Sequence, residues 1–435
     1  MKRFIPMGCV LALALTLSAC AGSRDEITEE FLPDTGPTTS TVTGTTPTST
    51  PTTTPVDPID EITELAAHVA EIRQLPVDVP AIEMRSAQQV LDGYQALNGL
   101  SLTGDDRFET EYLQMIGVLE GGGSVADLLG VCSIPGFYDP TTGSLVLREG
   151  LGELTPLGRR HLVGELTAAA TDMAHGWWGA MQALTRSGDA DAAAALSGLV
   201  RGDAAFHSGQ YVESALTATD RFAITLEQIS CEQQRSTPPG YVTELEAFGP
   251  EVGRAFVEDL ISGGGIAAVD AAYRNPPKSS EQIYHPARYG TDAPVSSIDL
   301  PALSVSGFSE VDAGVFGERH FRALLSDGIL SSQALQAATG WGGDSYRLLW
   351  DGSDLVFALL FEGDEARDAR ELAETLGGWA SASMSVGSGR PDNTGLAFEG
   401  QEYAFVAHNE AAVLVVLSSD ARAGREIRDA FWPEW

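Results

Sequence analysis

Basic residues are scarce in this sequence. It has 26 lysines and arginines against 61 aspartates and glutamates, so its formal net charge is -35. A chain this negative is repelled by the phosphate backbone of nucleic acids and by anionic lipid headgroups. We therefore expect no nucleic-acid partner and no electrostatic attachment to a membrane. The charge itself is typical of a soluble surface, as in a salty habitat.

The apolar run at the start of the chain is too short for a lasting membrane span. The segment MKRFIPMGCVLALALTLSAC has a basic beginning, an apolar middle and small residues before Cys20. This pattern predicts a signal peptide over residues 1–20. Leu17-Ser18-Ala19-Cys20 resembles the lipobox of bacterial lipoproteins. The resemblance implies cleavage before Cys20, a lipid such as palmitate on that cysteine, and an extracytoplasmic protein anchored to the bacterial cell membrane. The alternative is an ordinary signal peptide that happens to contain a cysteine.

Apolar residues are nearly absent from residues 21–58, which include PDTGPTTSTVTGTTPTSTPTTTPVDP. A segment rich in threonine and proline buries too little surface to order itself. We expect a disordered tether between the anchor and the folded part of the protein.

Cysteine is rare, with four in the whole chain, and Cys9 leaves with the signal peptide. No C-x-x-C or Cys/His spacing indicates a metal knuckle. Two cysteines of an exported domain often pair, so we predict a disulfide between Cys132 and Cys231. Two separate buried thiols are the alternative.

Hydrophobic periodicity divides the remaining chain into two parts and predicts an α+β fold. Residues 59–330 are predicted to form a mainly helical domain, and residues 335–435 a small α+β module. The predicted helices of the first domain cover 60–73, 86–97, 107–130, 156–186, 189–207, 210–234 and 241–262. IPGFYDPTTGSLVLREG predicts a hairpin before the long helix. In the module, strands are expected in WDGSDLVFALLF, GLAFEGQEYAFVAH and EAAVLVVLSS, with helices near 364–382 and 420–431.

The predicted long helix carries a polar row beside its apolar stripe. The row falls at helical spacing, so its members share one face. It consists of His161, Glu165, Ala168, Asp172 and His175. On its own, such a row is most simply a solvated helix face.

Several motifs together resemble a family of secreted bacterial metallopeptidases of the gluzincin type. They are GFYDPTTGSLVLRE, LTPLGRRHLVGELTAAATD, VRGDAAF, PPGYVTELEAFGPEVGRAFVEDLISGGG and AAYRNPPKSSEQIYHPARY, in this order over roughly residues 60–325. In the family, a helix with H-E-L-T-H-A supplies two zinc ligands and a later E-G-D-A supplies the third. The resemblance implies a zincin-like fold for the helical domain.

The same resemblance implies that the metal centre is lost. Gly164 and Ala168 stand where the two histidines belong, and Arg201 stands where the third ligand belongs. Glu165 matches the general base of the family, here a vestigial catalytic residue. A carboxylate without a Lewis acid leaves water near its bulk pKa. We therefore expect no bound metal and no cofactor.

A relocated metal site is a less favoured hypothesis. His161 and Glu165 are one turn apart, but His175 lies too far along the helix to share one ion with them. His207 and His285 are more simply packed or capping histidines.

Arg201 is expected to take the place of the metal electrostatically. The family's third ligand lies near the general base, so we predict a direct ion pair between Arg201 and Glu165. Asp172 or Asp203 is a candidate second acceptor, and His161 and His285 are further candidates for the cleft. The alternative places Arg201 in solvent.

The sequence thus predicts a lipid-anchored pseudo-metallopeptidase that binds a peptide or protein partner through the former active-site cleft. One alternative is a peptidase or glycosidase with a metal-independent or altered mechanism that uses Glu165. Another is a structural protein of the cell envelope. The sequence sets no oligomeric state.

Overall fold

The structure is a computed structural model, and it describes residues 58–97, 106–119, 121, 123, 128, 133–291, 298–392 and 395–431. The chain divides into a unit of Met1–Thr54 and a unit of Pro55–Trp435. All described residues belong to the second unit. Cys20, residues 21–57 of the predicted tether and Cys132 lie outside the described residues. Pro58, predicted as the last tether residue, begins α1.

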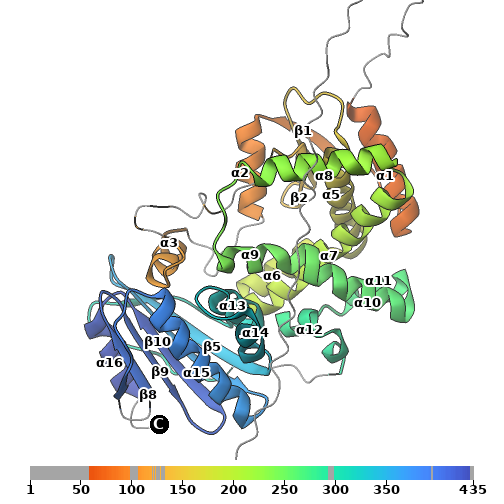
Figure 1. The fold of residues 1–435 in the computed structure, drawn as a ribbon. Coiled ribbons are helices and arrows are strands. Elements are labelled where there is room, and N and C mark those ends of the chain that lie inside the picture. The colour runs from red at the N-terminus through yellow and green to blue at the C-terminus, as the bar shows by residue number, and fades with distance from the viewer. Residues whose placement is uncertain are drawn as a thin grey trace, which may run out of the picture. The chain divides into compact units, whose positions relative to one another are not determined.

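Residues 58–291 are mainly helical (Figure 1). The α-helices are α1 (Pro58–Arg73), α2 (Ala87–Leu97), α3 (Asp106–Met115), α5 (Pro156–His175), α6 (Trp177–Arg186), α7 (Ala190–Ser214), α8 (Ala218–Glu232), α9 (Gly240–Ala247), α10 (Arg254–Gly264), α11 (Ile266–Arg274) and α12 (Ser280–Tyr284). A π-helix, η1 (Phe248–Gly253), connects α9 to α10, and a 3-10 turn, η2 (Pro286–Arg288), follows α12.

Three predicted helix boundaries are wrong for reasons of local backbone chemistry. The helix predicted over 107–130 ends at Met115 as α3, because Gly117 adopts a left-handed conformation with φ 79°. The segment predicted as one helix over 156–186 is two helices, because Gly176 adopts a left-handed conformation with φ 66° and ends α5. In contrast, α7 runs through the predicted break at 208–209. It ends before Thr217, whose side chain forms a capping box with Asp220 that starts α8.

The predicted hairpin is confirmed, and a third strand joins it. β2 (Gly136–Asp139) pairs antiparallel with β3 (Ser144–Arg148), and β1 (Ala81–Arg85) pairs parallel with β3 on its other side. Thr155 caps the N-terminus of α5 directly after this sheet by accepting a hydrogen bond from the Gly158 N–H at 3.0 Å. This cap therefore sets where the long helix begins after the sheet.

The C-terminal part contains a seven-stranded antiparallel sheet of order β4-β5-β6-β10-β9-β8-β7. Its strands are β4 (Ser309–Gly314), β5 (Trp341–Trp350), β6 (Leu355–Gly363), β7 (Arg390–Asp392), β8 (Gly395–Glu399), β9 (Tyr403–His408) and β10 (Ala412–Ser418). The helices are α13 (Gly317–Leu325), α14 (Ser331–Ala338), α15 (Ala366–Ser383) and α16 (Ala421–Phe431). The predicted strands and helices of this part are confirmed. Because β4 is an edge strand of the sheet, the sheet begins before the boundary predicted at 330–335.

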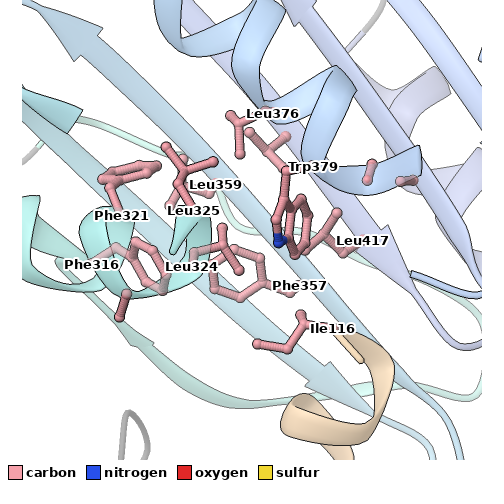
Figure 2. Packing of buried hydrophobic residues seen from close by; sticks show 14 of the residues in the cluster. Ile116, Phe316, Phe321, Leu324, Leu325, Phe357, Leu359, Leu376, Trp379 and Leu417 are labelled. Atoms are coloured by element: carbon pink, nitrogen blue, oxygen red, sulfur yellow. The ribbon is translucent and has the colours of Figure 1, made fainter. Parts of the chain in front are cut away.

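Apolar cores cover both faces of this sheet. On one face, α13 and α15 pack against the central strands, and Figure 2 shows Trp379 of α15 beside Leu417 and Phe357 of the sheet. On the other face, Ile427 and Phe431 of α16 pack against strand residues that include Phe405. Figure 1 shows α15 lying along its face of the sheet. Burial on two sides explains why β6 and β10 are almost continuously apolar.

The observed fold is therefore a mixture of α-helix and β-sheet, in which a mainly helical part precedes a helix-covered antiparallel sheet. None of the helices in the described ranges is both long enough and apolar enough to cross a membrane.

Candidate functional site

Gly164 lies where α5 meets α7. A Cβ atom added at Gly164 would be 3.0 Å from Ser208 Oγ and 3.8 Å from Ala204 Cβ. These distances leave little room for a larger residue, and a histidine side chain would push the two helices apart or displace Ser208. The position that the resemblance assigns to a zinc ligand is thus a helix-packing position.

Ala168 offers a backbone carbonyl oxygen and a methyl group to its surroundings. Its carbonyl oxygen accepts hydrogen bonds from Trp177 Nε1 and Thr171 Oγ, both at 3.0 Å. The Trp177 ring belongs to the apolar cluster against which Ala168 packs. The second position that the resemblance assigns to a zinc ligand therefore helps to fold the start of α6 back onto α5.

Glu165 and His161 hold strand β2 against α5. Glu165 Oε2 accepts the Tyr138 N–H at 2.9 Å, and His161 Nε2 lies 2.7 Å from the Gly136 carbonyl oxygen. The two side chains are also close to each other, with His161 Nε2 3.7 Å from Glu165 Oε1. Both side chains are 20% exposed. They are brought together as predicted, and they occupy the free edge of β2.

The ion pair predicted between Arg201 and Glu165 is wrong. Arg201 Nε donates to Ser197 Oγ at 3.1 Å, and its terminal nitrogen Nη2 donates to the Leu97 carbonyl at 3.5 Å. No ion pair joins Arg201 to Glu165 in the part of the chain that the structure describes. The reason is steric, because the Arg201 stem lies against the bare Cα of Gly249 and directs the guanidinium toward α2.

The charges of Glu165 and Arg201 both affect Tyr94 of α2. Its ring centroid is 5.8 Å from that of His161. Burial raises the pKa of Tyr94, the Glu165 charge raises it further, and Arg201 opposes both effects. The tyrosine thus belongs to the polar group that contains Glu165 and Arg201, although no motif in the sequence points to it.

Asp172 is also engaged by neighbours other than Arg201. Its carboxylate accepts the Tyr138 hydroxyl at 3.0 Å and the Trp178 N–H at 2.9 Å. Burial and the Asp172 charge raise the pKa of Tyr138. Asp172 therefore fixes the β2 strand and the start of α6.

Asp203 forms a buried cluster with Arg73 from the end of α1. Arg73 Nε donates to Asp203 Oδ2 at 2.9 Å, and both side chains have 0% exposure. Tyr273 also donates to Asp203, at 3.1 Å, and His207 Nδ1 lies 2.9 Å from Asp203 Oδ1. Burial raises the pKa of Asp203, but His207 and Arg73 outweigh burial and lower it overall. Asp203 is thus a structural anchor rather than a second acceptor for Arg201.

His175 extends this cluster to its edge. Arg73 donates to Asp270 at 2.7 Å, and His175 Nε2 lies 3.3 Å from the same carboxylate oxygen. The His175 ring stacks on Tyr273 with centroids 4.9 Å apart. Burial lowers the pKa of His175, although Asp270 raises it. Among the described residues, no three histidine, cysteine, aspartate or glutamate side chains are grouped to hold a metal.

The SEQIYHP segment joins the helical part to the C-terminal sheet. The Ser280 N–H donates to Asp191 Oδ2 at 2.9 Å, and Ser280 Oγ accepts the Arg319 N–H at 3.1 Å. His285 Nε2 lies 3.1 Å from Glu318 Oε1 of α13. His285 is therefore placed at this joint and not with Glu165.

The joint also buries two carboxylates that sequence analysis missed. Asp344 of β5 accepts the Phe316 and Gly317 N–H groups at the start of α13, and Asp191 of α7 lies against Gly317. Burial raises the pKa of Asp191 to about 7 and that of Asp344 to about 6. In the sequence, these two residues are ordinary acids in a chain full of them.

Cys231, near the end of α8, is disulfide-bonded. Its predicted partner, Cys132, lies outside the described residues, so the pairing itself stays a prediction. The lipid attachment at Cys20 stays a prediction for the same reason.

A family model described as "Domain of unknown function (DUF8575)" matches residues 304–428. The match covers the C-terminal sheet with its helices and stops short of the helical part. No curated protein matches the chain, and no solved structure matches it.

Proposed function

We propose that the protein is a lipid-anchored, extracytoplasmic binding protein whose helical part is a non-catalytic relative of gluzincin metallopeptidases. The observation that carries the proposal is the chemistry at the three former ligand positions. Gly164 packs on α7, Ala168 offers only a carbonyl oxygen that already accepts two hydrogen bonds, and Arg201 brings a cation. A Zn²⁺ ion requires nitrogen, sulfur or carboxylate ligands, and these positions supply none.

Glu165 supports the same proposal. A general base needs a free lone pair directed at a water molecule that is acidified by a metal. One oxygen of Glu165 is instead bonded to the Tyr138 N–H, and the other faces His161. This arrangement serves to keep β2 on α5.

Binding is the activity that such a scaffold retains. Tyr94, His161, Glu165 and Arg201 are all partly exposed, so polar donors and acceptors reach the surface where the resemblance places the peptidase site. A peptide or a protein segment is the ligand class that this ancestry favours.

Zinc content and hydrolysis test the non-catalytic part of the proposal. The full chain, purified in detergent, is equilibrated with ZnCl₂, desalted and analysed for metal, and is then assayed on labelled casein beside Glu165→Gln. We expect far less than one zinc per chain and no hydrolysis that the substitution abolishes. One tightly held zinc, or casein cleavage lost in Glu165→Gln, would contradict the proposal.

The anchor is tested separately. We expect Cys20 to incorporate labelled palmitate in bacterial cells and Cys20→Ala to move from the membrane fraction to the soluble fraction. A Cys20→Ala protein that remains fully with membranes would remove lipidation from the proposal.

A further inference from the structure

Paired glycines bring α7 and the π-helix η1 into backbone contact. Gly198 and Gly202 lie one turn apart on α7, and Gly249 and Gly253 lie at the same spacing on η1. A Cβ added at Gly202 would be 2.2 Å from the Gly253 backbone, and one added at Gly253 would be 2.1 Å from the Gly198 carbonyl oxygen. π-Helical turns are often found at functional sites. This close approach fixes the positions of the side chains that border it.

Two arginines border this contact. The Arg201 stem lies over Gly249, where an added Cβ would be 2.6 Å from Arg201 Cδ. Arg319 of α13 places its Cζ 5.2 Å from the ring centroid of Phe248, the residue before that glycine. The positive charge of Arg201 lowers the pKa of Arg319, after the larger effect of burial. Two guanidinium groups from different elements thus share one turn of η1.

Neither arginine has a carboxylate partner within ion-pair distance among the described residues, in a chain with 61 acidic and 26 basic residues. Arg201 is bonded to a hydroxyl and a carbonyl oxygen. Arg319 is partly exposed, and its buried Nε has no hydrogen-bond partner in the described part of the chain. An unpaired guanidinium with a buried donor is costly, and an oxyanion satisfies it best.

The acidic groups in this neighbourhood are engaged elsewhere. Glu246 pairs with Arg235 at 3.2 Å, and Glu244 accepts the Tyr284 hydroxyl at 3.4 Å. The negative charge of Asp191, which lies at the joint, raises the pKa of Arg319, but less than any other cause. The positive charge of the two arginines is therefore not neutralised by a direct contact.

We infer that Arg201 and Arg319 form a receptor for an oxyanion, and that the oxyanion is the C-terminal carboxylate of a bound peptide. A carboxylate accepts two parallel hydrogen bonds from a guanidinium, and the second arginine supplies further donors. Phosphate shares this chemistry. The choice of carboxylate rests on the proposed peptide-binding function, whereas the anion site rests on the two arginines.

Fluorescence polarisation of the full chain with labelled random octapeptides tests the inference. One pool carries a free C-terminal carboxylate and the other a C-terminal amide. Inorganic phosphate is added as a competitor and is also titrated alone into the protein by calorimetry. We expect the acid pool to bind about tenfold more tightly than the amide pool, and Arg201→Gln and Arg319→Gln each to weaken acid binding about tenfold. Arg422→Gln, an exposed arginine on α16, is the matched control and is expected to bind like the native chain.

The outcomes separate this inference from the proposed function. Equal binding of acid and amide pools overturns the inference and leaves peptide binding standing. Phosphate binding that both arginine variants lose, without peptide binding, supports the anion site and refutes the peptide ligand. Binding of neither probe overturns both. If circular dichroism shows that a glutamine variant is unfolded, Arg201→Lys and Arg319→Lys replace it, with a smaller loss expected because the charge stays and the fork is lost.

Discussion

Two buried carboxylates of the same helix, Asp203 and Asp191 of α7, have opposite electrostatic surroundings. Asp203 lies in the helical part beside Arg73 and His207, which lower its pKa against the effect of burial. Asp191 lies at the joint, where burial raises its pKa to about 7 and the charges of Asp344 and Asp189 add to the rise. Burial is nearly complete at both positions. A cation within hydrogen-bonding distance, rather than burial, decides which form of a buried acid is stable.

The two acids therefore have opposite effects on stability as pH changes. The folded pKa of Asp203 is below its unfolded value, so its contribution is present above the unfolded value of about 3.9 and is lost as pH falls. The folded pKa of Asp191 is above its unfolded value, so stability declines as pH rises from about 4 to about 7 and then levels off. The helical cluster is weakened as pH falls below about 4, and the joint is weakened as pH rises from about 4 to about 7.

The largest effect is expected from Arg73→Met, which removes the cation from the helical cluster. Asp203 would remain buried without its partner, and such changes cost about 3–5 kcal/mol of unfolding free energy. Denaturant unfolding followed by circular dichroism measures the loss. Arg85→Met is the control, because the side chains of Arg85 and Glu83 are 34% and 40% exposed, and water and salt screen their ion pair, so its loss should change stability little. A loss below about 1 kcal/mol in Arg73→Met would mean that the cluster does not depend on its cation.

A smaller but still large effect is expected in the apolar core of the sheet. Leu376 of α15 is fully buried between α15 and the sheet (Figure 2). Leu376→Ala should cost about 3 kcal/mol by lost burial and cavity formation. Leu330→Ala, at a position 75% exposed, is the control and should change stability little. Equal losses in the two variants would contradict the observed core.

The joint is tested by Asp191→Asn, which keeps an acceptor for the Ser280 N–H and removes the titration. We expect the native chain to lose about 3 kcal/mol of stability between pH 4 and pH 7 from this residue, and the variant to lack that part of the slope. The charged groups that face Asp191 are Asp344, Asp189 and Arg319. Glu374→Gln changes an exposed acid of α15 and should leave the slope as it is. A slope unchanged by Asp191→Asn would show that Asp191 is ionised throughout this range.

The smallest effect is expected on α8, whose apolar stripe faces outward. Phe222, Leu226 and Ile229 are 63%, 52% and 44% exposed. Glu227 of the same helix accepts a hydrogen bond from the Thr155 hydroxyl. Phe222→Ser should change the unfolding free energy by less than about 0.5 kcal/mol. Thermal unfolding against the native chain decides this, and a loss above about 1 kcal/mol would show that the ring is buried in solution.

Much of the fold was predictable because its signals are local. The apolar runs of β6 and β10 and the turn residues of the β2–β3 hairpin need no distant partner to be recognised. β5 was missed because it begins with Trp341-Gly342-Gly343-Asp344, where two glycines and an acid hide a buried strand. Asp344 is tolerated there because the Phe316 and Gly317 N–H groups at the start of α13 donate to it, together with the Trp341 indole N–H. Phe316 and Gly317 lie more than twenty residues before Asp344, with the rest of α13 and α14 between them and β5.

The candidate site likewise has some features that the sequence predicts and others that it does not. The sequence alone determined that residues 164 and 168 carry no metal-ligating side chain, since glycine and alanine have none in any fold. The contact of Glu165 with His161 also followed from helical spacing, because one turn fixes the distance between them. These features depend on residue chemistry and on neighbours along the chain.

Only the tertiary structure decided which charges meet. Arg201 turns away from Glu165 because Gly249, distant in sequence, lets η1 approach α7 and takes up the arginine stem. Asp203 instead forms an ion pair with Arg73 at the end of α1, and no motif around Arg73 indicates this pairing. A long side chain reaches many partners, and the choice among them depends on how closely two backbones approach. That distance is set by packing between segments far apart in the chain, so sequence spacing does not determine it.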